Sequence, residues 1–396
     1  KQKTAYEIKE CDGVQTCALP IYAMLIASAF LFTALVARAI ARALLRREIV
    51  EIVTTPAEST QFHPGKTPEI AGVVVDLRDG LGIPREQTDI DTDALQLCEA
   101  TLESGAGALL HCLDTSKTGL SGISRGAARA VMRAAPARTI VLVDASEGRV
   151  YPNEVKRDLA HGMMVLVTGS LFIGGPPFSA ALLVPDAMVE AIAESAPDEH
   201  IEAPIARFDA PRALRSRLAP NAGALANPGL GLRWTAALRE LEDYLAIDET
   251  LRRDILETFS RKARSMASRY AFLSVEPLPL DDLDDPLRES IVTLVPLTPG
   301  GPRKPIEYAA GLRAALAAPC PGFEGDARCH VGRPITVGDR VALPLSASAP
   351  MVREVSRRLD MGLGFDRAMS PVFRDLGRSE EHTSELQSHS FISYAV

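Results

Sequence analysis

Short apolar runs rich in β-branched residues recur along the chain, with helix-like stretches between them. The clearest runs are Ile70–Val75, Ala108–Leu113, Thr139–Asp144, Met163–Thr168 and Ala180–Val184. Continuous apolar runs without polar alternation are typical of strands buried on both faces, as in a parallel sheet. The helical patterns between them cover Asp91–Glu103, Gly122–Ala135 and Pro152–His161. We therefore predict an α/β fold with a doubly wound, mostly parallel sheet.

The pattern changes after a link rich in Pro, Gly and Asn at Ala219–Gly231. Beyond it, longer helices alternate with a few strand-like runs, which is typical of a smaller α+β domain. The predicted helices are Leu232–Leu245, Glu249–Tyr270, Ile306–Ala317 and Met351–Leu359, and the predicted strands are Ser290–Val295 and Val341–Ser346. We therefore expect a large domain over residues 22–218, followed over residues 219–377 by interdomain helices and a small C-terminal domain.

The two ends of the chain differ from everything between them. Residues 1–21 and 378–396 show neither helical nor strand periodicity. Arg378–Ser388 can be back-translated to a sequence that looks like a short-read library adapter, and Gly13–Ile21 resembles the reverse complement of the same oligonucleotide. We expect both ends to be adapter-derived and residues 22–377 to be the biological fragment.

An uncharged segment, Tyr22–Ala37, precedes a row of arginines that starts at Arg38. Without the adapter-like residues before it, the segment is short for a membrane span, which needs roughly 20 apolar residues. The spacing of Ala, Leu and Arg onward to Leu45 suits a helix buried on most sides. We expect a buried helix here and no membrane anchor.

Composition narrows the function classes further. The chain of 396 residues is 46% hydrophobic and 24% charged and has a net charge of −8, which excludes disorder and gives no basic surface for nucleic acid. Its six cysteines include no CxxC pair, so we expect no metal site. Neither a Gly-x-Ser-x-Gly elbow nor a glycine-rich dinucleotide turn follows a predicted strand. We expect a cytoplasmic protein with reduced thiols.

Polar residues follow three of the predicted strands. Asp114–Gly119, Asp144–Glu147 and Thr168–Pro177 begin where the apolar runs end. Ligands of open α/β sheets bind at the carboxyl ends of the strands. A carboxylate on one strand beside a turn rich in hydroxyls and glycines on the next offers a partner for a protonated pyridine nitrogen and a cradle for a phosphate. Pyridoxal phosphate requires both.

At these turns the sequence resembles a known family. The order Asp144-Ala145-Ser146-Glu147, then a helix, then Thr168-Gly169-Ser170-Leu171 and Gly174-Gly175-Pro176 resembles the class V aminotransferase-like branch of the pyridoxal-phosphate-dependent fold type I enzymes. This branch includes cysteine desulfurases and selenocysteine lyases. The turn Ser116–Gly119 looks like the family's Asn-Glu-Thr-Gly turn. The resemblance covers most of residues 70 to 360, and it implies pyridoxal phosphate as cofactor, an amino-acid-like substrate in intact relatives and a homodimer.

The resemblance also implies roles for individual residues. Asp144 would pair with the pyridine nitrogen, Thr168 and Ser170 would contact the phosphate, and Ser116 and Glu147 would lie near the ring hydroxyl, with Thr118 in the same cofactor-binding set. Each residue has a plainer interpretation, because Asp, Ser and Thr after a strand often bind backbone groups instead. His111, inside an apolar strand, is interpreted as a satisfied core histidine.

The chain departs from the family at the catalytic position. Leu171 stands where the family has its Schiff-base lysine, and a leucine side chain has no nitrogen with which to form an imine. Pro344 stands where the family usually has the arginine that receives the substrate carboxylate, and Arg340 is a poor substitute. Lys117 follows a different strand and is a weak replacement for the missing lysine.

Two functions are consistent with these residues. The first is a pyridoxal-phosphate-dependent, class V aminotransferase-like protein acting on amino acids, of which this copy is inactive because of Leu171. The alternative is a non-catalytic, dimeric binding or scaffold protein that keeps the fold and an anion pocket at Thr168–Gly175. Neither involves nucleic acid or a membrane.

Overall fold

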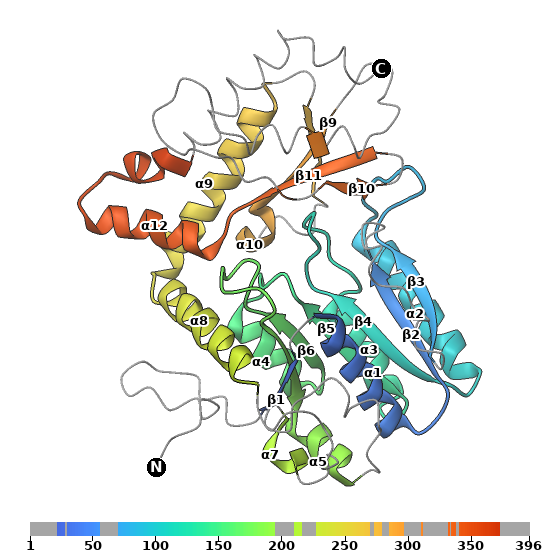
Figure 1. Cartoon of the computed structure of the whole chain (residues 1–396). Coiled ribbons are helices and arrows are strands. Elements are labelled where there is room, and N and C mark those ends of the chain that lie inside the picture. The colour runs from blue at the N-terminus through green and yellow to red at the C-terminus, as the bar shows by residue number, and fades with distance from the viewer. Residues whose placement is uncertain are drawn as a thin grey trace, which may run out of the picture.

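A seven-stranded sheet forms the centre of the large domain, and a second, smaller sheet lies in the upper part of the view in Figure 1. The computed structural model describes residues 22–27, 30–55, 70–194, 210–215, 227–269, 273–278, 285–296, 310–311, 332, 334–337 and 340–372. The two ends that we expect to be adapter-derived lie outside these residues.

The large sheet has the strand order β1-β7-β6-β5-β4-β2-β3. The five strands from β3 to β6 are parallel, and β7 and β1 run antiparallel to their neighbours. The strand bounds are β1 Tyr22–Ala27, β2 Ile49–Thr55, β3 Ala71–Asp76, β4 Gly107–Leu113, β5 Thr139–Ala145, β6 Met164–Thr168 and β7 Ala180–Pro185. The carboxyl ends of β4, β5 and β6 therefore meet at one edge.

Helices cover both faces of this sheet, because successive strand residues point to opposite sides. Leu109 belongs to the apolar cluster shared with α1 (Phe30–Leu45) and α5 (Asp186–Glu194). Its neighbour Leu110 belongs to the cluster on the other face, shared with α2 (Gln87–Glu103), α3 (Arg125–Ala134) and α4 (Pro152–Ala160). A short helix, α7 (Arg212–Arg215), follows α5. The doubly wound sheet that the apolar runs predict is confirmed.

Two long helices, α8 (Pro228–Leu245) and α9 (Glu249–Ala267), lead to the smaller sheet, whose order is β10-β11-β9-β8. Its strands are antiparallel where they pair. The bounds are β8 Leu273–Val275, β9 Ile291–Pro296, β10 Ile335–Val337 and β11 Arg340–Ser346, with α10 at Pro286–Glu289 and α12 at Ala349–Asp360. Apolar residues from α9, β9 and α12 form one cluster, which also includes Phe172 from the turn after β6, so the core of this unit extends to the large domain.

The N-terminal segment corrects one prediction. Residues 22–27 form an edge strand, antiparallel to β7, and only the part from Phe30 onward is helical. Ala and Leu suit either state, and pairing with β7 satisfies backbone groups that an isolated helix start would leave open. From residue 36 to residue 41 the helix is buried, with Ala37 and Ile40 inaccessible to solvent. Among the described helices, none has an apolar stretch long enough to cross a membrane.

A further difference concerns the strands, and one predicted helix is not tested. The apolar pattern does not predict strand β2, which lies between β3 and β4. It does not predict the short strands β8 and β10 either. The predicted helix Ile306–Ala317 lies outside the described residues except for positions 310 and 311.

Candidate functional site

The carboxyl ends of β4, β5 and β6 bring the predicted residues together. In the register of the sheet, Asp144 lies opposite Leu113 on one side and Leu166 on the other. The turn after β5 and the turn after β6 are joined directly, because the Thr168 hydroxyl donates to Ser146 O and the Phe172 N–H donates to Glu147 O. The two turns that carry the family resemblance therefore form one unit.

Asp144 is held at both carboxylate oxygens. Its Oδ1 accepts a hydrogen bond from the Ser146 N–H at 3.0 Å, and its Oδ2 lies 3.2 Å from Nε2 of His111. The side chain is almost fully buried, with 5% of the residue exposed. The neighbouring strand thus supplies the carboxylate with a histidine partner.

His111 continues into a row of buried charged groups. Its Nδ1 lies 3.5 Å from Oε1 of Glu51 on β2. The Oε2 atom of Glu51 in turn accepts a 2.8 Å hydrogen bond from Nε of Arg38 on α1. We call Arg38, Glu51, His111 and Asp144 the buried ion row. His111 is buried in the core, as its interpretation as a core histidine expects, and its Nε2 is hydrogen-bonded to the candidate site carboxylate.

The ion row shifts the pKa values of its members. Burial alone would lower the pKa of His111, but hydrogen bonding and attraction to Asp144 and Glu51 outweigh it and raise the pKa to about 9. Burial alone would raise the pKa of Glu51, but His111 and Arg38 reverse the effect, and its pKa is lowered. At neutral pH the row therefore alternates positive and negative charges.

The turn after β6 is tightly packed around its glycines. A Cβ on Gly169 would lie 2.4 Å from Cβ of Ala237 on α8, and one on Gly175 would lie 2.6 Å from the same atom. Gly174 has φ +83°, a conformation that favours glycine. Ser170 is half-buried, whereas Leu171 projects with 47% of its surface exposed. The backbone at position 171 is thus fixed while its side chain is accessible.

The Ser116 hydroxyl is bonded within its own turn, and the Thr118 hydroxyl takes part in a contact between the two domains. The Ser116 hydroxyl oxygen accepts from the N–H groups of Thr118 and Leu120. The Thr118 hydroxyl oxygen accepts from Nη2 of Arg78, which also forms a buried, two-point ion pair with Glu276 of the small domain. These two hydroxyls therefore have protein partners in this structure.

Two further charged residues near the site, Asp114 and Arg340, form ion pairs or hydrogen bonds with other protein groups. Asp114, directly after β4, pairs with Arg125 at 2.6 Å, and Arg125 also binds Asp158. Arg340 donates to Gly82 O at 3.0 Å and lies 3.9 Å from Glu276, so it belongs to the interdomain contact. Lys117 is exposed. Within the described parts of the chain, no group of three or more residues is placed to hold a metal ion.

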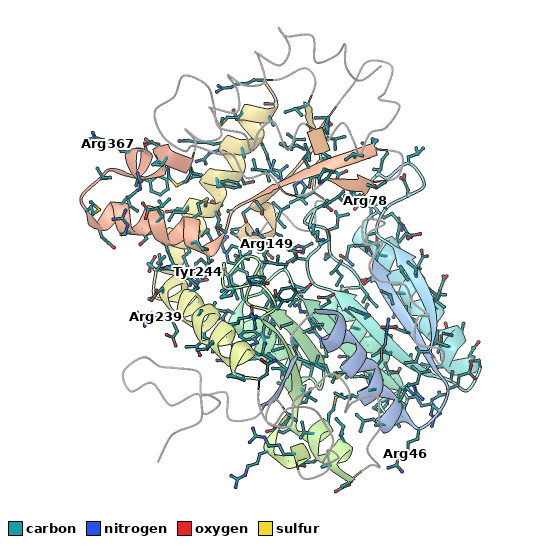
Figure 2. All side chains as sticks on the ribbon, in the orientation of Figure 1. Arg46, Arg78, Arg149, Arg239, Tyr244 and Arg367 are labelled. Carbon is teal, nitrogen blue, oxygen red and sulfur yellow. The ribbon has the colours of Figure 1, made fainter. Side chains whose placement is uncertain are left out.

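Sequence reasoning missed Arg149, which fastens the turn after β5 to the small domain (Figure 2). Its guanidinium is buried, donates to the backbone oxygens of Leu287 and Ala347, and lies 4.8 Å above the ring of Phe172. Burial lowers the pKa of Arg149 to about 10. The acceptors lie far along the chain, so no local pattern could have revealed the contact. Glu51 and Arg38 were missed for the same reason.

Comparisons with known proteins add information on the fold. No protein-family model and no curated protein matches the sequence. Among solved structures, Sphingomonas wittichii serine palmitoyltransferase is similar, with a TM-score of 0.54 and 13% identity over 91% of this chain and 73% of that chain. A structure described as SPT with PLP internal aldimine has a TM-score of 0.52 and 14% identity over the same shares.

An archaeal O-phosphoseryl-tRNA(Sec) selenium transferase is also similar, with a TM-score of 0.53 and 10% identity over 91% of this chain and 69% of that chain. The chain has the fold of the pyridoxal-phosphate-dependent fold type I enzymes. The candidate site, with Asp144 and the turn Thr168–Gly175, lies at the carboxyl edge of the central sheet of this fold. At such low identity the likeness extends to the fold alone.

Proposed function

We propose that this chain is a class V aminotransferase-like protein that binds pyridoxal phosphate reversibly at the carboxyl edge of β4, β5 and β6. The proposal rests above all on Asp144, a buried carboxylate held beside a charged His111 at the strand end of this fold. Pyridoxal phosphate, when bound, supplies a ring that withdraws electrons from an attached amine. Leu171 gives this copy no amine with which to attach the ring, so we propose that it is catalytically silent.

The donor and acceptor set fits the pyridine end of the cofactor. Each carboxylate oxygen of Asp144 has a hydrogen-bond partner, Ser146 at one and His111 at the other, and a carboxylate oxygen accepts two hydrogen bonds. Each oxygen therefore keeps acceptor capacity for a protonated ring nitrogen.

The phosphate end requires a rearrangement of one hydroxyl. Thr168 donates to Ser146 O in this structure, so its proton would have to move to a phosphate oxygen. The hydroxyl of Ser170, on a half-buried residue, would supply a second donor. We propose that Thr168 and Ser170 hold the phosphate, and that Glu147 lies near the ring.

Substituting the carboxylate tests this assignment. In equilibrium dialysis, the unaltered chain is expected to bind pyridoxal phosphate and to release it on dilution. Asp144→Asn is expected to weaken binding about 10- to 100-fold, because a charge-assisted hydrogen bond is worth about 1.5–3 kcal/mol. Asp186→Asn is the matched control, because Asp186 begins α5 directly after antiparallel β7, at the opposite edge of the sheet. Equal affinity for Asp144→Asn and Asp186→Asn would contradict the pyridine contact.

A second candidate function is a non-catalytic binding or scaffold protein that keeps the fold. The observation that favours it is the engagement of the Thr118 hydroxyl by Arg78, whose guanidinium also pairs with Glu276 of the small domain, while the Ser116 hydroxyl is engaged within its own turn. A scaffold of this kind would bind inorganic phosphate as tightly as pyridoxal phosphate, whereas the first proposal requires the ring to add affinity. Competition dialysis with phosphate separates the two functions.

A further inference from the structure

The buried ion row is balanced in charge in the absence of a ligand. Arg38 and protonated His111 carry positive charge, and Glu51 and Asp144 carry negative charge, in alternating order across α1, β2, β4 and β5. All four residues are at most 6% exposed. An uncompensated charge is costly in such a place, because water cannot solvate it.

A pyridinium ring bound at Asp144 would bring one more positive charge to this row. The proposed function requires that charge, because a protonated ring nitrogen is the partner of the Asp144 carboxylate. The balance of the row is restored if another member gives up a proton. Histidine is the member whose two ring nitrogens exchange protons near neutral pH, whereas the arginine stays charged.

The two nitrogens of His111 are held differently. Nε2 lies 3.2 Å from Asp144, within hydrogen-bond distance, while Nδ1 lies 3.5 Å from Glu51. Loss of the Nδ1 proton therefore leaves the shorter contact to Asp144 intact. The tautomer that remains, with its proton on Nε2, still orients the carboxylate.

We propose that His111 releases its Nδ1 proton to solvent when a pyridinium ring binds at Asp144. The Nδ1–H bond breaks, and its electron pair stays on the imidazole nitrogen. The site gains the proton on the pyridinium nitrogen of the ligand and loses the Nδ1 proton to water. This inference rests on the proposed function. His111 is then a positioning residue with a second role, because it compensates the charge of the ligand.

Glu51 and Arg38 prepare His111 for this role. Glu51 holds the proton on Nδ1 before the ligand arrives, and Arg38 fixes the Glu51 carboxylate. The pKa of His111, raised to about 9, agrees with a ring that is protonated at neutral pH in the absence of ligand. Glu51→Gln is therefore expected to leave His111 neutral from the start.

Calorimetric proton counting tests the inference. Pyridoxine 5′-phosphate is the probe, because it has the ring and the phosphate but no aldehyde to react with surface lysines. Titrations at about pH 7.5, in two buffers that differ in ionisation enthalpy, give the protons exchanged per ligand bound. The unaltered chain is expected to release about one proton more than His111→Gln or Glu51→Gln. His161→Gln, at an exposed histidine, is the matched control and should release as many protons as the unaltered chain.

A merely structural ion pair would not change this proton count. Binding with the same proton count in the unaltered chain and in His111→Gln would overturn this inference and leave the proposed function standing. Absence of binding heat in both buffers would overturn the proposed function, and this inference with it. If His111→Gln does not fold, ¹⁵N NMR of the unaltered, histidine-labelled chain tests the inference instead. Nδ1 of His111 should lose its proton when the ligand binds. An imidazole of His111 that stays protonated on both nitrogens with ligand bound would contradict the inference.

Discussion

Replacing Leu171 with lysine is expected to create an imine chromophore with pyridoxal phosphate that the unaltered chain lacks. The backbone of the turn is fixed by the Phe172 N–H bond to Glu147 O and by the Gly174 N–H bond to Leu171 O. Because 47% of Leu171 is exposed, a longer polar side chain needs no repacking of the core. The lysine amine would then stand where the family has its Schiff base.

The measurement is the absorbance of the imine near the edge of the visible range, followed by borohydride reduction and peptide mapping. Leu232→Lys is the matched control, since Leu232 is another exposed leucine, on α8, and should give no saturable chromophore. A reduced adduct on Lys117 of the unaltered chain would contradict the interpretation of this copy as silent. Failure of Leu171→Lys to form an adduct, while the ring still binds, would show that position 171 is wrongly assigned.

The contribution of the charged His111 to stability is expected to disappear in alkaline solution. Contacts with Asp144 and Glu51 raise the pKa of His111 from 6.5 to about 9 in the folded chain. A group whose folded pKa is raised stabilises the fold fully below its unfolded pKa, and the effect is lost as the pH rises through the folded pKa. The shift corresponds to about 3 kcal/mol, lost between about pH 6.5 and pH 9.

Urea unfolding at a series of pH values measures this loss. Other groups also titrate, so the informative quantity is the difference in unfolding free energy between the unaltered chain and His111→Gln. That difference should shrink by about 3 kcal/mol from pH 6.5 to above pH 9. The control His161→Gln should track the unaltered chain throughout. A difference independent of pH would show that His111 is not charged in the folded chain.

The sequence predicted the strands that are buried on both faces. Runs such as Thr139–Asp144 and Met163–Thr168 are almost purely apolar, because neighbouring strands and helices cover nearly all of their residues, and the structure confirms them as β5 and β6. In a parallel sheet the carboxyl ends of neighbouring strands meet. For that reason the sequence alone could place Asp144 and Thr168 at one edge.

The pattern failed where tertiary contacts override it. Strand β2 carries Glu51, a charged residue that is only 2% exposed, and no local signal shows that Arg38 and His111 compensate its charge. The uncharged Ala and Leu of residues 22–27 predict a helix but suit both states, and pairing with β7 decides for a strand. Arg149 was missed because its acceptors are backbone oxygens, which have no sequence signature.

A crystal structure of the chain grown with pyridoxal phosphate tests the central claim most directly. We expect the ring at the carboxyl edge of β4, β5 and β6, with its nitrogen within hydrogen-bond distance of the Asp144 carboxylate, Thr168 and Ser170 at the phosphate, and no covalent bond to any side chain. A ring bound elsewhere, a ring nitrogen turned away from Asp144, or an imine to Lys117 would contradict the account.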